Sequence, residues 1–311
     1  MCLNDPHFDI DSYTGHVSRL KPAYPVEIIN RQSVGICIGA STISLVKIEA
    51  LADGSIQIVE RQSFTSHGNP QNLLKEALPR FASSPLPAVV TGRKFRKRVA
   101  LTSISEPEAI ESAMEIYQDE NHQFAALASL GAETFVVYEL DHQGRIRKLI
   151  SRNQCASGTG EFFMQQIGRM DLDLDEAVRI SMNSTPFKVS GRCSVFCKSD
   201  CTHALNKGIP KEEVAAGLAL MIAEKAEELL KKSHPGRFML VGGVTQNRTV
   251  IEFLKKKYPD LYIPNEAPFF EALGAAVYGL HHEVSKYDNS KNVFVDTESL
   301  FTFHKPLPEF R

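Results

Sequence analysis

The chain has 311 residues, of which 43% are hydrophobic and 23% charged, and its formal net charge is −2. This composition is ordinary for a soluble globular protein of one large or two modest domains, and the charge gives no preference for nucleic acid or for an anionic membrane. No run of about 18 apolar residues predicts a membrane-spanning helix. The acidic N-terminus, MCLNDPHFDIDSY, lacks the apolar core of a signal peptide, so a cytoplasmic location with reduced cysteines is expected.

The first half of the chain predicts mainly strands. Residues 1–32 are polar and contain several prolines, which is typical of an extension. The apolar runs on either side of Asp53 and Gly54 predict a hairpin, because Asp-Gly is a typical hairpin turn. LPAVVTG, residues 86–92, predicts a buried strand, and residues 106–118 predict a helix.

The pattern then restarts. Residues 124–141 predict strand, turn and strand, and from Gly158 the chain becomes helical. Residues 212–233 predict an amphipathic helix with acids at its start and lysines at its end, which suits its dipole. Residues 238–244 predict a buried strand ending in glycines, and residues 271–283 predict a closing helix. We therefore expect two structurally similar halves, each opening with a hairpin whose first strand carries a glycine turn.

Three glycine turns are candidate phosphate cradles, because backbone N–H groups approach a phosphate closely only at glycine or other small residues. The turns contain Gly39, Ala40, Ser41 and Thr42 in the first hairpin, Gly131 and Ala132 in the second, and Gly242 and Gly243 after a late strand. Any one of them is also what a tight hairpin or a close packing contact would use. Their order and strand context are more specific than any single turn.

This arrangement resembles the superfamily of actin, sugar kinases and heat-shock ATPases, and LGAETFVVYEL is similar to the second phosphate loop of the chaperones. The resemblance implies an α/β fold of two ribonuclease-H-like lobes with a nucleotide cleft between them. In such folds a hairpin from each lobe holds the phosphates and a Gly-Gly turn holds the adenosine. The implied domains are an extension, lobe I, lobe II and a tail, over residues 1–32, 33–120 plus 268–283, 121–267 and 284–311.

Four further motifs carry a narrower resemblance. They are QCASGTGEFF, CSVFCKSD, GGVTQN and EALGAAVYG, at residues 154–163, 193–200, 242–247 and 271–279. In this order they are similar to the activator components of 2-hydroxyacyl-CoA dehydratases and to the relatives that drive benzoyl-CoA reductases. The third motif adds Asn247 to the residues expected at the nucleotide.

The narrower resemblance implies a homodimer that shares one [4Fe-4S] cluster and binds ATP or ADP with Mg²⁺. Each subunit would give Cys155 and Cys193 to the cluster. A cubane needs four thiolates, and a two-fold axis would supply the second pair. The resemblance further implies a ferredoxin or flavodoxin as electron source and an iron–sulfur protein of the dehydratase or reductase type as electron acceptor.

Cys197 and Cys201 depart from the family pattern, which has alanine and an apolar residue at these positions. On a continuous helix Cys193 and Cys201 would lie about 12 Å apart along the axis, so the three cysteines should not all bind one cluster. Adjacent pairs, about 6 Å apart, remain possible ligands. Cys197 and Cys201 are either small packing residues, part of another cluster geometry, or redox groups.

The phosphate loops also depart from the superfamily pattern. Cys37 and Ser129 stand where the superfamily has aspartates that handle Mg²⁺. Glu133, where the activators have glutamine, is the candidate catalytic residue that orients or deprotonates the attacking water. Glu106 either helps to position Mg²⁺ or is a helix-start charge that favours the dipole.

Three functions are consistent with these residues. The first is an ATP-dependent electron donor, or activase, for an iron–sulfur dehydratase or reductase. The second is a small-molecule kinase of the same superfamily, against which the missing aspartates at Cys37 and Ser129 argue. The third is a nucleotide-binding regulatory relative that does not hydrolyse ATP. Iron content and ATP turnover distinguish them.

Overall fold

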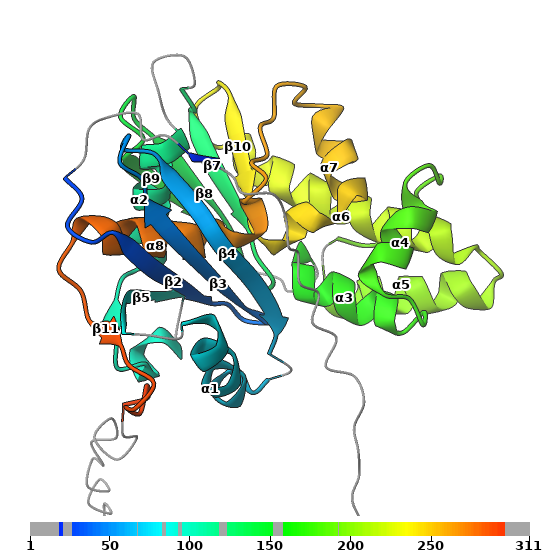
Figure 1. Ribbon diagram of the computed structural model, residues 1–311. Coiled ribbons are helices and arrows are strands. Elements are labelled where there is room, and N and C mark those ends of the chain that lie inside the picture. The colour runs from blue at the N-terminus through cyan, green and yellow to red at the C-terminus, as the bar shows by residue number, and fades with distance from the viewer. Residues whose placement is uncertain are drawn as a thin grey trace, which may run out of the picture.

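The computed structural model describes residues 19–20, 27–66, 68–82, 85–92, 95–117, 123–151, 158–191 and 193–295. Within these ranges the chain forms two β-sheets, and helices pack on both faces of each sheet (Figure 1). We call the sheet built by the first half, with its helices, the first lobe, and the other sheet with its helices the second lobe. None of the helices in the ranges given above is long and apolar enough to cross a membrane.

The first sheet is seven-stranded, in the order β1-β4-β3-β2-β5-β11 with β6 beside β5. Its strands are β1 (Arg19–Leu20), β2 (Gln32–Ile38), β3 (Thr42–Ala50), β4 (Ile56–Thr65), β5 (Leu86–Gly92), β6 (Thr102–Ser103) and β11 (Lys286–Tyr287). Strands β2, β3 and β4 form an antiparallel meander, and β5 runs parallel to β2. Gly54 closes the β3–β4 turn with a φ of 76°, which confirms the predicted hairpin.

Both faces of the central strands β2, β3 and β5 are largely buried, because these strands are apolar on both sides. On one face, α1 (Pro70–Phe81) packs Leu74 and Leu78 against the sheet. On the other, α8 (Phe270–His281) comes so close that a Cβ at Gly35 would lie 1.8 Å from the carbonyl oxygen of Ala272. Helix α1 was not among the predicted elements.

The second sheet has four strands in the order β10-β7-β8-β9. They are β7 (Ala126–Leu130), β8 (Phe135–Leu140), β9 (Ile146–Ser151) and β10 (Phe238–Val241). Strands β7, β8 and β9 again form an antiparallel meander, and β10 runs parallel to β7. The four strands repeat the plan of β2, β3, β4 and β5, so the expectation of two similar halves is confirmed.

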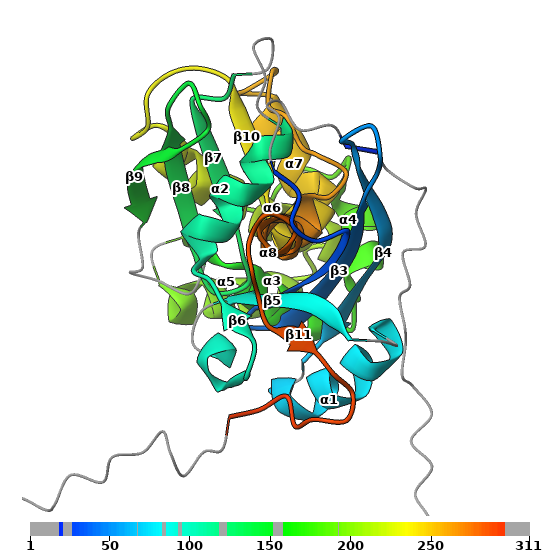
Figure 2. The same ribbon diagram turned by 60° about the vertical axis from the view of Figure 1, so that its left-hand side comes forward.

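Helices α2 (Glu106–Tyr117) and α8 lie between the two sheets, as Figure 2 shows. They cross so tightly that a Cβ at Gly274 would lie 1.7 Å from the carbonyl oxygen of Ala109. Met114 and Phe270, from α2 and α8, reach the core beneath the second sheet. The two helices therefore join the lobes into one packed unit.

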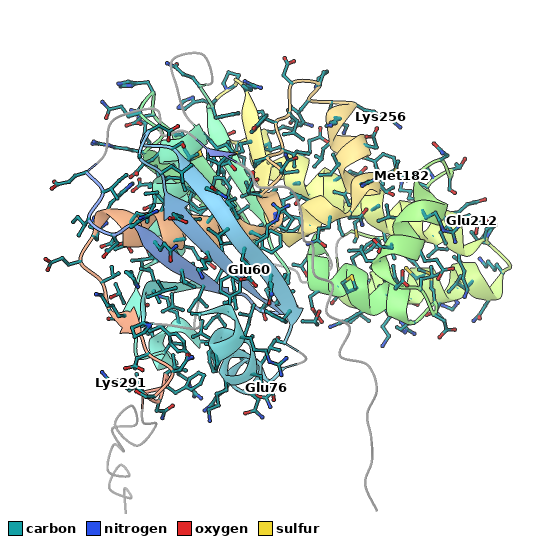
Figure 3. All side chains as sticks on the ribbon, viewed as in Figure 1. Glu60, Glu76, Met182, Glu212, Lys256 and Lys291 are labelled. Atoms are coloured by element: carbon teal, nitrogen blue, oxygen red, sulfur yellow. The ribbon has the colours of Figure 1, made fainter. Side chains whose placement is uncertain are left out.

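The other face of the second sheet carries a helical region. It consists of α3 (Gly160–Gly168), α4 (Leu174–Ser181), α5 (Ser194–Asn206), α6 (Lys211–Leu230) and α7 (Arg248–Lys255). Figure 3 labels Met182 and Glu212 in this region, far from Glu60 on β4 of the first lobe. The helices predicted over 106–118, 212–233 and 271–283 are confirmed within a few residues of their ends.

Two segments that were expected to form an extension and a tail contribute strands to the first sheet. Leu20, inside the expected extension, pairs with Ile56 on β4. Tyr287, inside the expected tail, pairs with Leu86 on β5 and is buried, as is Phe294. Their polar sequences did not indicate strands, but an open sheet edge accepts any backbone with free N–H and C=O groups.

Candidate functional site

The two predicted phosphate turns lie at equivalent places in the two sheets. In the first, between β2 and β3, the Gly39 N–H donates to the Thr42 carbonyl oxygen at 2.9 Å. In the second, between β7 and β8, the Gly131 N–H donates to the Thr134 carbonyl oxygen at 3.0 Å. Gly39 and Ala40 are exposed, and Gly131 and Ala132 are half-buried. Both turns therefore leave room beside small residues for a group to approach the backbone.

The start of α3 links these two turns. The backbone N–H of Glu161 donates to the Ala132 carbonyl oxygen at 2.9 Å, and the N–H of Gly160 donates to the Gly131 carbonyl oxygen at 3.3 Å. The Glu161 carboxylate, in turn, accepts a hydrogen bond from the Ser41 hydroxyl in the first turn. One residue thus touches a turn from each lobe. Sequence reasoning missed Glu161 because no local pattern shows that α3 meets both hairpins.

The third glycine turn follows β10. Gly242 has a φ of 95°, and a Cβ there would lie 2.5 Å from the Leu130 carbonyl oxygen, so the position requires glycine. Its N–H donates to the Ala267 carbonyl oxygen at 2.7 Å. The next glycine, Gly243, is exposed and begins η3 (Gly243–Gln246). The turn is therefore crowded at Gly242, where it packs on β7, and exposed at Gly243.

Asn247 lies at the end of this turn and is 4% exposed. Its Oδ1 caps α7 by accepting a hydrogen bond from the Val250 N–H at 3.2 Å. Within the described part of the chain its Nδ2 has no hydrogen-bond partner. A buried donor left open beside a glycine turn is the kind of group that a bound ligand satisfies.

Cys37 and Ser129, which replace the expected aspartates, occupy equivalent positions two residues before the glycine of each turn. The Ser129 hydroxyl donates to Oε1 of Glu271 at 2.7 Å. Burial, and then the charges of Glu271 and Glu106, raise the pKa of the Cys37 thiol well above its usual value. Carboxylates are therefore present beside both strands, but they come from the first turns of α8 and α2.

Glu133, the predicted catalytic residue, is exposed on the second turn. This place on the turn is expected, because Glu133 directly follows Gly131 and Ala132 in the sequence. Glu106, by contrast, is half-buried at the start of α2. The structure thus presents two kinds of carboxylate, one on a hairpin tip and others at the base of the hairpins.

Of the predicted cluster cysteines, Cys155 lies outside the described residues. Cys193 is half-buried at the N-cap of α5, and its side chain makes no capping hydrogen bond. The unsatisfied N–H groups of that helix end favour a negatively charged group beside Cys193. A thiolate ligand at this position would lie in a favourable field.

Two glycines bring the flanks of the two cysteine motifs together. A Cβ at Gly158, three residues after Cys155, would lie 1.7 Å from Cδ of Lys225 on α6. A Cβ at Gly191, two residues before Cys193, would lie 3.8 Å from Cε of the same lysine. The two motifs therefore converge on one half-buried lysine side chain.

Cys197 and Cys201 face the core of the second lobe, with 0% and 4% exposure. The Cys197 sulfur lies 3.8 Å from the sulfur of Met221 on α6. Hydrogen bonding with Cys197 lowers the pKa of the Cys201 thiol. This apolar packing favours the interpretation of both as core residues. Among the described residues no group of three or more His, Cys, Asp or Glu side chains is arranged to hold a metal ion.

The first turn of α5 also exposes two large apolar side chains. Val195 is 70% exposed and Phe196 is 63% exposed, directly after Cys193. Adjacent exposed apolar residues of this size are typical of a contact surface. The cysteine, the open helix end and this apolar pair thus share one surface of the second lobe.

Comparison with known proteins agrees with these features. Residues 92–279 match the family model described as the BadF/BadG/BcrA/BcrD ATPase family. The chain is 27% identical to the 2-hydroxyisocaproyl-CoA dehydratase activator of Clostridioides difficile over 170 residues, which cover 54% of this chain and 64% of that relative. It is 27% identical to the activator of lactoyl-CoA dehydratase of Anaerotignum propionicum over 158 residues, 49% of this chain and 60% of the relative. The chain thus spans less than two thirds of either relative.

Solved structures with a similar backbone include the activator of the 2-hydroxyisocaproyl-CoA dehydratase from Clostridium difficile with bound ADPNP. Its TM-score is 0.70 at 24% identity, over 80% of this chain and 94% of that chain. Component A of the Acidaminococcus fermentans (R)-2-hydroxyglutaryl-CoA dehydratase has a TM-score of 0.63 at 21% identity, over 79% and 96% of the two chains. These likenesses show an actin-like ATPase fold of two ribonuclease-H-like lobes, as the resemblance to that superfamily implied.

Proposed function

Because the chain belongs to the BadF/BadG/BcrA/BcrD ATPase family, we propose that it is an ATP-dependent activator that passes single electrons to an iron–sulfur dehydratase or reductase. The observation that carries this proposal is the position of α3. Its first residues touch both phosphate turns through Ser41 and Ala132, while Gly158 just before it packs on Lys225 beside the second cysteine motif. Helix α3 therefore links the expected nucleotide position to both cysteine motifs.

Nucleotide binding would use the three glycine turns. The N–H groups of Ala40, Ser41 and Thr42, and those of Ala132 and Glu133, would hold the phosphates. Gly39 and Gly131, whose own N–H groups are bonded within the turns, would let the phosphates come close to the backbone. Gly242, Gly243 and Asn247 would hold the adenosine. The open Nδ2 of Asn247 supports this assignment, since it is a buried donor without a partner among the described residues. Membership of an ATPase family supports ATP and ADP as the nucleotides.

The residues of the cleft fit a Mg²⁺ ion that arrives with the nucleotide. Mg²⁺ in nucleotide sites keeps several waters and takes one or two carboxylates together with phosphate oxygens, so it needs no cage of protein ligands. Glu106 and Glu271 are carboxylates close enough to Cys37 for their charge to raise its pKa. When bound, Mg²⁺ supplies positive charge at the phosphates. Glu133 would orient or deprotonate the attacking water.

The cluster would be a [4Fe-4S] cubane shared by a homodimer, with Cys155 and Cys193 from each subunit. When bound, it supplies the electron. Support comes from Cys193 at the open N-terminus of α5, where the helix dipole would stabilise the negative charge of a thiolate and of a cluster. Val195 and Phe196, exposed beside it, would be covered by the second subunit. Lys225 would add a positive charge beside the two motifs.

The coupling would run through the chain's own contacts. The Glu161 carboxylate holds the Ser41 hydroxyl, in the turn that would receive the phosphates. A phosphate there would repel Glu161 and compete for this hydroxyl, which favours movement of α3. Movement of α3 would shift Gly158 against Lys225 and with it the flank of Cys155. After an electron has passed to the partner, a ferredoxin or flavodoxin in the cytoplasm would supply the next one.

The test is anaerobic iron and sulfide analysis of the purified protein with an optical spectrum. We expect a brown protein with about four iron atoms per dimer. Cys155→Ser and Cys193→Ser should each abolish iron binding, whereas Cys197→Ala, on the same helix as Cys193, should retain it. A colourless wild-type protein, or iron retained in Cys193→Ser, would contradict the proposed cluster.

One observation favours a second function, that of a nucleotide-binding regulator without hydrolysis. Cys37 and Ser129 stand where the superfamily has aspartates, so the usual strand carboxylates are replaced at both turns. Nucleotide binding without ATP turnover under anaerobic, Mg²⁺-containing conditions would support the regulator. Turnover would exclude it.

A further inference from the structure

Two carboxylates approach the base of the hairpins from helices that are related in the same way to the two sheets. Glu106 begins α2, which follows the strands of the first lobe, and Glu271 lies in the first turn of α8, which follows the strands of the second. The two helices pack against each other between the sheets. Each carboxylate is therefore carried by a helix that lies between the lobes.

Glu271 is directly connected to one of the two replaced positions. The Ser129 hydroxyl, 142 residues away in sequence, donates to its Oε1 at 2.7 Å. The carboxylate thus sits one hydrogen bond from the strand position at which an aspartate side chain would begin. Ser129 is half-buried, so the bond also fixes the direction of a charged side chain that water reaches only in part.

Glu271 also acts on the other replaced position. Its charge is the second cause, after burial, of the raised pKa of the Cys37 thiol on β2. Glu106 acts on Cys37 in the same direction but more weakly. One carboxylate on α8 is therefore close to the last residues of both first strands, β2 and β7.

We propose that Glu271 supplies the cleft carboxylate that neither β2 nor β7 carries, with Ser129 as its positioning residue. Its role would be to accept hydrogen bonds from water molecules around the nucleotide-bound Mg²⁺ and so to hold the ion on the phosphates. The inference rests on the proposed nucleotide site. It accounts for the simultaneous presence of a serine at 129 and a glutamate at 271.

The first experiment measures the affinity for ADP with and without Mg²⁺, together with ATP turnover, in wild type and Glu271→Gln. Glutamine keeps the shape of the side chain and can still accept the hydrogen bond from Ser129. We expect the gain in ADP affinity on adding Mg²⁺ to fall about 10-fold or more. Turnover should fall about 100-fold, while the affinity measured without Mg²⁺ stays unchanged.

A transplanted carboxylate provides the sharper test. In the double variant Ser129→Asp with Glu271→Gln, the strand again carries the charge and the helix does not. This variant should recover the Mg²⁺ dependence of ADP binding to within about 10-fold of wild type. Ser129→Ala alone should weaken it by about 5-fold, the worth of one hydrogen bond. Glu252→Gln, on the exposed side of α7, is the matched control and should change neither quantity.

The outcomes separate this inference from the proposed function. Wild-type protein that binds neither ADP nor ATP would overturn both. Wild-type protein that binds ADP more tightly with Mg²⁺, together with a Glu271→Gln protein of unchanged Mg²⁺ dependence, would overturn the role of Glu271 alone. A Glu271→Gln defect that the double variant does not rescue would show that the helix carboxylate is structural, which also overturns the inference. Thermal melts of each variant confirm that the compared proteins are folded.

Discussion

The two lobes are built from the same four-strand unit, but they differ in what connects its third and fourth strands. In the first lobe, α1 lies in the connection between β4 and β5; in the second, α3, α4, α5 and α6 lie between β9 and β10. The shared unit forms the glycine turns, and the larger insertion carries Cys193 and the exposed pair beside it. The repeat thus explains where a nucleotide would bind, while the insertion explains what the nucleotide could control.

The repeat extends to a glycine at the end of the fourth strand in each lobe, where Gly92 is the last residue of β5 and Gly242 directly follows β10. Gly92 has a φ of 108°, and a Cβ there would lie 2.2 Å from the Ile38 carbonyl oxygen. Gly242 has a φ of 95°, and a Cβ there would lie 2.5 Å from the Leu130 carbonyl oxygen. In both lobes this glycine lies directly against the last residue of the first strand. The same steric constraint therefore requires glycine at both positions.

The largest effect is expected from substituting this glycine pair. Gly92→Ala and Gly242→Ala should each lower the free energy of unfolding by about 3 kcal/mol, because each adds a Cβ at a positive φ and against a backbone carbonyl. Denaturant unfolding at pH 7 measures this. Gly243→Ala is the control, since a Cβ there has no atom within 4 Å. Unequal losses at 92 and 242 would argue against the equivalence of the two lobes.

A smaller effect should separate two cysteines of the insertion. In iron-free protein Cys197→Ser should cost about 1–3 kcal/mol of unfolding free energy, because it buries a hydroxyl in an apolar core. Cys193→Ser, at the half-buried N-cap, should cost less than about 0.5 kcal/mol. Denaturant unfolding of both variants tests the difference. Equal costs would argue against a packing role for Cys197.

The contact between the lobes at the first turn should contribute still less to stability. Ser41→Ala removes the hydrogen bond to Glu161 and should lower the free energy of unfolding by about 1 kcal/mol or less, because water replaces the lost partner at a half-buried site. Urea unfolding of the nucleotide-free protein gives the value. Thr42→Ala, on the same turn and exposed, serves as control. If Ser41→Ala lost several kcal/mol more unfolding free energy than Thr42→Ala, the bond between Ser41 and Glu161 would be what holds the lobes together.

The effect that is smallest at neutral pH is a pH dependence that only one of the two equivalent strand positions should show. The pKa of the Cys37 thiol is raised in the folded protein, whereas an unfolded thiol titrates near about 8.5. Its contribution to stability is therefore complete below about pH 8.5 and is lost as the pH rises above that value. Cys37→Ser should remove this part of the slope, measured by unfolding between pH 7 and pH 9.5. Ser129→Ala should leave the slope as in wild type.

Local sequence patterns were sufficient for much of the scaffold. Gly54 in the Asp-Gly turn, the apolar run of β5 and the acidic first turn of α6 each report on neighbours a few residues away. Such signals survive folding because the turn geometry and the helix dipole depend on the local backbone. The glycine of each phosphate turn belongs to the same class. The missed helix α1 had a local signal as well, since Asn69 before Pro70 is a typical helix start.

The functional assignments needed contacts between distant parts of the chain. The residue types alone establish that positions 37 and 129 lack carboxylates, but folding is required to bring Glu271 to Ser129 and Glu161 to Ser41, across 142 and 120 residues. Folding likewise places Cys197 and Cys201 in the core and leaves Cys193 at an open helix end. The residue type determines which chemistry a side chain can perform. The packing of α2, α3 and α8 decides which charges and hydrogen-bond donors lie beside that side chain and how deeply it is buried. These surroundings direct its chemistry.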